Sequence, residues 1–317
     1  MDAIQSLLNA VIVIVLLYAL ALLLRWRGVL KEEHSLVLAH IVTDLFLPAI
    51  VFVTLAGQSI QLDQLAPAGV MLTLELSMIA LAWVVSSLLG FDRSQQGAII
   101  FCSAFGSSTF LGYSIITQMY PNKPQAMTEA VLISEIGVGY TIFILGPILA
   151  AHFGSTGSDA RSLLSSSLKF FRSPVFFALL LGLLWGVLGL PGEDNAFLSP
   201  IFRVCHVLAT ALTPVAILAV GLMFKWPSLR GIILPLAIVV AIKLLLKPLL
   251  AGLAGSLLGF PGLWRDVLVL LAAMPPAVLG PVYLRRYGGN ASLASALLLA
   301  ATLISCTTLL VVFSLIG

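Results

Sequence analysis

Apolar residues run along this chain in long blocks, each about as long as a helix that crosses a lipid bilayer. Such a helix needs about 20 mostly apolar residues, and charged or Pro/Gly-rich breaks separate the runs. The predicted helices cover residues 4–24, 36–56, 66–90, 97–119, 126–152, 174–190, 197–223, 231–258, 264–286 and 292–316. The pattern predicts an all-α polytopic membrane protein of ten transmembrane helices.

The amino-acid composition also indicates a membrane protein and excludes several classes of function. Hydrophobic residues make up 60% of the 317 residues and charged residues 9%, whereas a typical soluble domain is about 25% charged. Too few polar residues are present to cover a soluble enzyme, and the basic surface of a nucleic-acid binder is missing. Cys102, Cys205 and Cys306 lie in apolar runs without metal-ligand or disulfide spacing. We therefore expect no enzyme, no metal, no cofactor and no nucleic-acid partner.

Basic residues alternate between the two sides of the predicted bundle. The loops after the odd-numbered segments hold most of them: Arg25, Arg27, Lys31, Arg93, Arg161, Lys169, Arg172, Lys225, Arg230, Arg285 and Arg286. The opposite side holds only Lys123, Arg203 and Arg265. Because cytoplasmic loops are enriched in Lys and Arg, we expect a multi-pass plasma-membrane protein with both termini on the outer side.

A polar segment at 153–173 divides the chain into residues 1–152 and 174–317. Its second part is amphipathic, with Leu164, Leu168 and Phe171 on one helical face and basic residues on the other. This pattern predicts a cytoplasmic helix lying on anionic membrane lipids.

The two parts of the chain resemble each other. His40 and Pro48 recur as His206 and Pro214 at an offset of 166, and residues 107–112 align with 275–280 at an offset of 168. Each part has five predicted helices, an odd number, so the second must insert upside down. The repeat is therefore predicted to be inverted, as in many secondary transporters.

The aligned residues at 107–112 and 275–280 are poor helix formers. Pro275 and Pro276 lack a backbone N–H, and glycines flank Ser107, Ser108 and Thr109. Ordinary kinks would explain each segment alone, but in lipid freed backbone groups need a protein or cavity partner. We therefore expect two broken helices that cross at mid-membrane, where half-helix N-termini would bind an anion. The candidate substrate-binding residues are Ser107, Ser108, Thr109, Gly112, Pro275, Pro276, Leu279 and Gly280, with further helix breaks at Pro48, Pro214 and Pro281.

Several ionisable residues lie within apolar segments, where charge is costly and functional roles are common. Glu135 is a candidate proton or cation coupling group, or a carboxyl that satisfies freed backbone near the crossing. Glu75 and Lys243 are equivalent in the repeat, so we expect them to pair or to share a proton, unless they form a purely structural salt bridge. Lys247, one turn beyond Lys243, would supply charge to an anion site or reach toward the interface.

Two histidines occupy equivalent positions of the repeat. His40 lies one turn before Asp44 on the same helical face, and His206 is its mate. Because histidine titrates near physiological pH, these residues are candidates for a pH-sensitive gate, or else neutral groups that hydrogen-bond within a scaffold.

Short motifs in order along the chain resemble the auxin efflux carrier family, which lies within the bile/arsenite/riboflavin transporter superfamily. They are Leu45–Ala49, Phe110–Gly112, Ser173–Pro174, Thr213–Pro214, Met274–Ala277 and Tyr287–Gly289. The resemblance implies a scaffold of the first, second, sixth and seventh helices and a moving domain of the other six. It also implies a carboxylate substrate carried at the crossing and a homodimer formed through the scaffold.

The chain departs from that family at three points. Family members often have asparagine in place of Ser107 and near Leu279 or Gly280, and proline near Ser114. The long hydrophilic loop of the plant auxin carriers is also missing. The resemblance therefore implies a bacterial-type member of the inner membrane, similar to the malate and malonate permeases, and not a plant auxin carrier.

The leading prediction is a secondary transporter or uniporter of a small mono- or dicarboxylate that works by elevator-like alternating access, with H+ or Na+ as the coupling ion if one is used. The alternatives are a sodium- or proton-coupled carrier of the bile-acid or cation–proton type, and a membrane receptor that does not transport.

Overall fold

The computed structural model describes residues 3–58, 60–154, 168–222 and 231–316, and within these ranges the chain is helical, with a single isolated β-bridge and no strand. Seven of the described helices are long and apolar enough to cross a membrane. A shorter apolar helix covers Pro174–Val187. The predicted all-α membrane protein is therefore confirmed.

The chain folds into two compact units, and each of them draws on both parts of the sequence. Unit 1 comprises Met1–Leu65, Thr109–Leu132 and Phe171–Phe224; unit 2 comprises Ala66–Ser108, Ile133–Phe170 and Lys225–Gly317. The boundaries of the units therefore differ from the division at the 153–173 linker.

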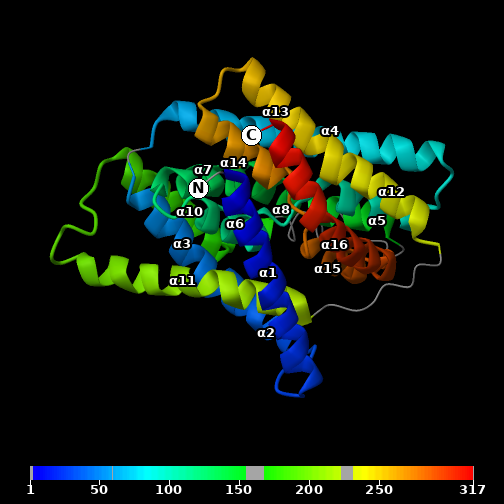
Figure 1. Ribbon diagram of the computed structural model, residues 1–317, viewed down its shortest axis with the longest axis horizontal. Coiled ribbons are helices and arrows are strands. Elements are labelled where there is room, and N and C mark those ends of the chain that lie inside the picture. Colours follow the sequence, from blue (N-terminus) through cyan, green and yellow to red (C-terminus); the bar gives the residue numbers. More distant parts are fainter. Residues whose placement is uncertain (1–2, 59, 155–167, 223–230, 317) are drawn as a thin grey trace. The chain divides into compact units, whose positions relative to one another are not determined.

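Unit 1 is built around two pairs of closely packed helices. Its elements are α1 (Ala3–Trp26), α2 (His34–Ile41), η1 (Val42–Phe46), α3 (Leu47–Ala56), η2 (Leu62–Leu65), α6 (Tyr113–Met119), α7 (Pro124–Leu132), α10 (Pro174–Val187) and α11 (Ser199–Leu222). Helix α1 packs across α11 (Figure 1), and α10 packs on α3. Gly221 faces Ala21 in the first pair, and Gly182 faces Leu55 in the second. Small residues at such contacts let helix backbones approach closely within a membrane.

Unit 2 has the larger buried core. Its elements are α4 (Ala66–Leu88), α5 (Arg93–Ala104), η4 (Ile133–Gly139), α8 (Tyr140–Phe153), α12 (Ile233–Val239), η6 (Val240–Leu246), α13 (Lys247–Leu257), α14 (Gly262–Ala272), α15 (Leu279–Arg286) and α16 (Ala291–Ile316). Phe101 and Phe105 of the α5 segment pack with Val239 and Leu297 in one cluster. The π-helix η3 (Ser108–Gly112) joins the two units.

The three additional prolines predicted to break helices all lie within described helices. Pro214 lies inside the continuous helix α11, and Pro48 stands in the first turn of α3, directly after the π-helix η1. A proline removes one hydrogen bond, and neighbouring helices or a local π adjustment can compensate for it. Pro281 lies inside α15, a few residues after an actual interruption of the helix.

The predicted interfacial helix falls mostly outside the described residues, since 155–167 are not among them. Its C-terminal end, Lys169–Arg172, forms a short 3-10 helix.

Candidate functional site

Unit 2 contains two helices that stop abruptly in the middle of apolar sequence. Helix α5 ends at Ala104, and the next residue, Phe105, has an extended backbone. Helix α14 ends at Ala272, and α15 begins only at Leu279. Both interruptions occur where Gly106–Ser107 and Pro275–Pro276 disfavour a helix.

The two interrupted segments pair with each other through one isolated antiparallel bridge. Gly106 and Pro276 form an antiparallel bridge. The backbone N–H of Ser107 donates to the carbonyl of Pro275 at 2.8 Å, and that of Ala277 donates to the carbonyl of Phe105 at 3.0 Å. This pairing satisfies backbone groups that the interrupted helices leave open, as a low-dielectric environment requires.

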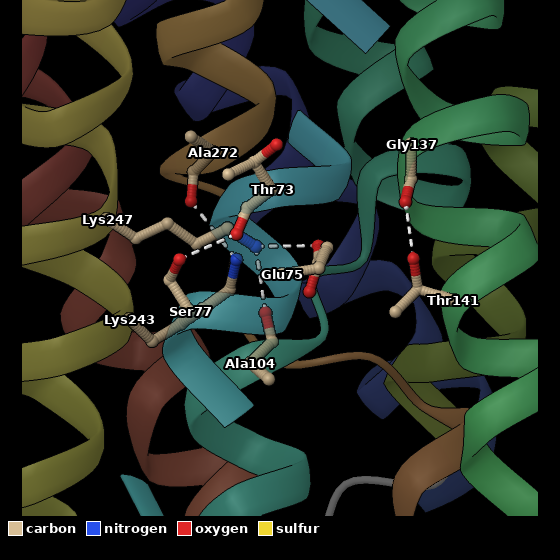
Figure 2. Close-up of polar contacts among 9 residues, drawn as sticks. All are labelled: Thr73, Glu75, Ser77, Ala104, Gly137, Thr141, Lys243, Lys247 and Ala272. Atoms are coloured by element: carbon tan, nitrogen blue, oxygen red, sulfur yellow. Dashed lines mark hydrogen bonds and ion pairs between the residues drawn. The ribbon is translucent and has the colours of Figure 1, made fainter. Parts of the chain in front are cut away.

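Two fully buried lysines bind the ends of the interrupted helices (Figure 2). Lys247 Nζ donates to the carbonyl of Ala104 at 2.8 Å, and Lys243 Nζ donates to the carbonyl of Ala272 at 3.1 Å. Each carbonyl belongs to the last residue of its half-helix, where the helix dipole is negative. Each ammonium therefore caps the C-terminal end of one half-helix.

The two capped positions are equivalent in the repeat. Ala104 and Ala272 are separated by 168 residues, the offset that relates Ser107 to Pro275. Both lysines nevertheless come from one segment, η6 and the start of α13. The two acceptor carbonyls are therefore related by the repeat, whereas the two donor lysines are not. Comparison of the two parts of the sequence does not reveal this difference.

Glu75 of α4 forms a direct ion pair with one of the two lysines. Its Oε1 lies 2.6 Å from Lys247 Nζ, and both side chains are fully buried. The predicted partner, Lys243, donates to the Ala272 carbonyl instead. The direct ion pair is therefore formed by Lys247 and not by Lys243, the partner predicted from the repeat.

Further buried polar atoms of the described chain lie in these segments without a hydrogen-bond partner. They are Glu75 Oε2, Ser103 Oγ and Ser107 Oγ. Buried polar groups in proteins are normally satisfied, so each unsatisfied acceptor or hydroxyl near the break is a group that a ligand or water could bind. Ser107 is 5% exposed. It is the residue among these three that the sequence predicted to bind substrate.

Lys243 and Glu135 both lie on π-helices. Lys243 belongs to η6 and Glu135, which is 2% exposed, belongs to η4. The η4 segment packs tightly on α4, since a Cβ on Gly137 would lie 2.8 Å from the Cβ of Met71. Single π turns inside α-helices are frequent at functional sites, and this irregularity is a signal that the apolar periodicity did not reveal.

The remaining candidates occupy different places. Pro275, Pro276, Leu279 and Gly280 lie in unit 2 with Ser107 and Ser108, whereas Thr109 and Gly112 belong to unit 1. A Cβ on Gly280 would lie 3.3 Å from the Cβ of Phe101, so α15 approaches the α5 segment closely there.

The histidine candidates are exposed and lie in unit 1. His40 Nδ1 is 4.0 Å from Asp44 Oδ2, and His206 Nε2 is 3.3 Å from Glu193 Oε2. They are therefore not buried scaffold groups within this chain. Sequence reasoning missed Glu193 because it lies in a polar loop thirteen residues before His206.

Comparisons with known proteins match nearly the whole chain. A protein family described as "membrane transport protein" matches residues 6–156 and 158–313. An uncharacterized transporter of Methanothermobacter thermautotrophicus is 27% identical over 314 residues, 98% of this chain and 97% of the relative. The Escherichia coli uncharacterized transporter YfdV is 25% identical over 287 residues, 86% of this chain and 87% of the relative.

A shorter match carries a substrate name. A Rhizobium meliloti protein named "Putative malonate transporter" is 37% identical over 123 residues, 37% of this chain and 38% of that protein. With the family match along both parts of the sequence, the chain belongs to the membrane transport protein family that contains the auxin efflux carriers.

Proposed function

We propose that this protein is a secondary transporter of a small organic anion, a mono- or dicarboxylate. The observation that carries the proposal is the pair of antiparallel helix interruptions in unit 2, with lysine ammoniums bound to both C-terminal ends. Interrupted helices in the middle of a membrane protein are characteristic of substrate sites in transporters.

The electrostatics of the interruptions favour an anion. Lys243 and Lys247 offset the negative dipole ends of α14 and α5, whereas the N-terminal end of α15 keeps its positive partial charge. The first N–H groups of a helix have no partner within that helix. The half-helix C-termini are thus neutralised, and the positive end of α15 at Leu279, in the same unit as Ser107, is left to attract a carboxylate.

Alternating access follows from an inverted repeat of five plus five helices. Packing within each unit supports the repeat: α1 on α11 corresponds to α10 on α3 in unit 1, and α4 on α5 corresponds to α13 on α14 in unit 2. In this proposal unit 1 contains the scaffold, and unit 2 carries the substrate across the membrane in an elevator-like movement. The protein would lie in the bacterial inner membrane with both termini outside, as a dimer formed through scaffold helices.

The relative named as a malonate transporter makes malonate the first substrate to test. Purified protein in proteoliposomes should take up labelled malonate saturably, with competition by other small carboxylates and none by neutral analogues such as malonamide. Saturable flux of no carboxylate tested would contradict the proposal. Ligand binding without counterflow would favour a receptor instead.

A pair of lysine variants tests the site itself. Lys243→Met removes an ammonium from the interruption, so we expect malonate uptake to fall at least about tenfold, the effect of one lost charge-assisted contact of about 1.5 kcal/mol or more. Lys31→Met, a 69% exposed lysine far from unit 2 in sequence, is the control and should transport normally. Equal uptake by Lys243→Met and the wild type would exclude this lysine from the mechanism.

A further inference from the structure

Unit 1 contains a cavity of about 600 Å³ that the proposed transport mechanism does not use. It lies where α3, α10, α11 and the start of α7 meet the 188–194 loop. All of its lining residues belong to unit 1. This volume is in the range of small-molecule sites.

Acidic groups dominate the charge of this cavity. Glu193 and Asp194 line it, and no lysine or arginine does so among the described residues. Lys123 precedes the lining residue Pro124 but lies over the Tyr120 ring at 5.7 Å. Glu193 pairs with His206 at 3.3 Å, whereas no ion pair of Asp194 is found within the described chain.

Two helix ends add to the negative potential. Helix α3 ends at Ala56 and α10 at Val187, and residues from both C-terminal ends line the cavity. The ends are pressed together, since a Cβ on Gly186 would lie 2.6 Å from the carbonyl oxygen of Leu55. Carbonyls at helix C-termini favour cations. The first turns of α7 and α11 also reach the lining, at Pro124, which has no N–H, and at Phe202.

Aromatic rings form one wall. Trp185 and Phe202 both line the cavity, with ring centroids 6.3 Å apart. The ring centroid of Phe52 lies 5.7 Å from that of each of these two rings, so Phe52 packs against both. Trp185 Nε1 donates to the Pro191 carbonyl, which ties this wall to the loop that bears the carboxylates.

From this combination we propose that the cavity is a binding site for a small organic ammonium ion. Carboxylates with aromatic faces are the groups that recognise alkylammonium cations. A bare metal ion fits less well, because no group of three His, Cys, Asp or Glu side chains able to hold one occurs among the described residues. An anionic substrate would be repelled, so the site is distinct from the interruptions in unit 2.

The ligand is expected to be soluble rather than a phospholipid headgroup. Phosphatidylcholine carries a phosphate a few bonds from its ammonium, and that phosphate would face the same carboxylates. A free amine or quaternary ammonium brings only the favourable charge.

Choline and its neutral isostere 3,3-dimethyl-1-butanol test the proposal, because they share a shape and differ in charge. Calorimetric titration of the whole protein, in a maltoside detergent without choline lipids, should show choline binding at least about fivefold more tightly than the alcohol. The Glu193→Gln/Asp194→Asn variant should lose at least about fivefold in choline affinity. Both residues are exposed, so folding should not be affected.

The matched control is Glu33→Gln/Asp63→Asn, which removes two exposed carboxylates of unit 1 outside the cavity. It should bind choline as the wild type does. Absence of choline binding, equal affinity for the alcohol, or unchanged binding by the cavity variant would each overturn the proposal. Choline binding that is kept in phosphatidylglycerol nanodiscs but lost in phosphatidylcholine nanodiscs would assign the cavity to the lipid headgroup and overturn the soluble-ligand proposal.

Discussion

The Lys247–Glu75 pair offers a quantitative test of how unit 2 is held together. Lys247→Met would remove two contacts at once, the 2.6 Å ion pair with Glu75 and the 2.8 Å hydrogen bond to the Ala104 carbonyl. Both partners would stay behind in a site with no exposed surface at either charged side chain. The end of α5 would therefore lose its cap as well as its charge balance.

The expected cost follows from burial. Removing one partner of a buried ion pair costs about 3–5 kcal/mol, because the other charge is left without compensation. An uncapped carbonyl adds to this cost. We therefore expect Lys247→Met to lower the free energy of unfolding by about 3–5 kcal/mol.

A double-mutant cycle separates the ion pair from the carbonyl cap. Glu75→Gln keeps the shape of the side chain and the bond between Lys247 and Ala104 but leaves the Lys247 ammonium without its carboxylate, so it too should cost about 3–5 kcal/mol. In the double variant neither member of the ion pair is left without the other, so its cost should fall short of the sum of the single costs by about 1–3 kcal/mol. Reversible unfolding in mixed detergent micelles, followed by circular dichroism, measures all three differences.

The exposed pair Lys31–Glu33 is the control. Its atoms are 3.8 Å apart and its side chains are 69% and 71% exposed, so neutralising it should change stability by less than about 0.5 kcal/mol. Additive losses for Lys247→Met and Glu75→Gln, within about 0.5 kcal/mol, would refute the reasoning. They would mean that the two charges do not interact in the folded protein.

Other predictions concern transport and packing. Gly106→Ala would place a Cβ 2.7 Å from Lys243 Nζ and displace that ammonium, so malonate uptake should fall at least about tenfold. The control Gly69→Ala, whose Cβ meets nothing within 4 Å, should transport normally. Equal uptake rates of the two variants would show that the position of the ammonium is unimportant. In many carriers the C-terminal carbonyls of half-helices bind the coupling Na+, but here lysines occupy these carbonyls. Replacing sodium with potassium should therefore leave malonate uptake unchanged. A clear loss of uptake would reveal a sodium site. Gly137→Ala would bring a Cβ to 2.8 Å from that of Met71 and should cost about 1–3 kcal/mol in detergent unfolding; a neutral effect would indicate looser packing of η4 on α4.

The proposed coupling and gating groups can be separated by the same transport assay. Glu135 lies in the buried π-helix η4, whereas His40 and His206 are exposed in unit 1. In the proposed transporter, Glu135→Gln should alter uptake more than His40→Gln does, because only the buried carboxyl belongs to the unit that carries substrate. The reverse order would favour a gate formed by the histidines.

The sequence by itself determined that this is a helical membrane protein and where most of its helices run. The reason is that hydrocarbon admits only segments with internally satisfied backbones, so length and apolar content suffice to locate α4 or α16. The helix-poor residues around Ser107 and Pro275 also stood out locally, because glycine and proline act through their own backbone.

Only the tertiary structure decided which groups meet at these interruptions. Lys243 and Lys247 are one turn apart on one segment, and the sequence could not tell which ammonium reaches Glu75 and which reaches Ala272, because a long side chain has many rotamers and its partner lies on another helix. The acidic cavity was equally hidden, since Glu193 and Asp194 lie in a loop whose position depends on how α3 and α10 end. The apolar content and the glycines and prolines of each segment thus determined the positions of the helices. The partners of the charged residues and the cavity depended on contacts between residues far apart in the chain.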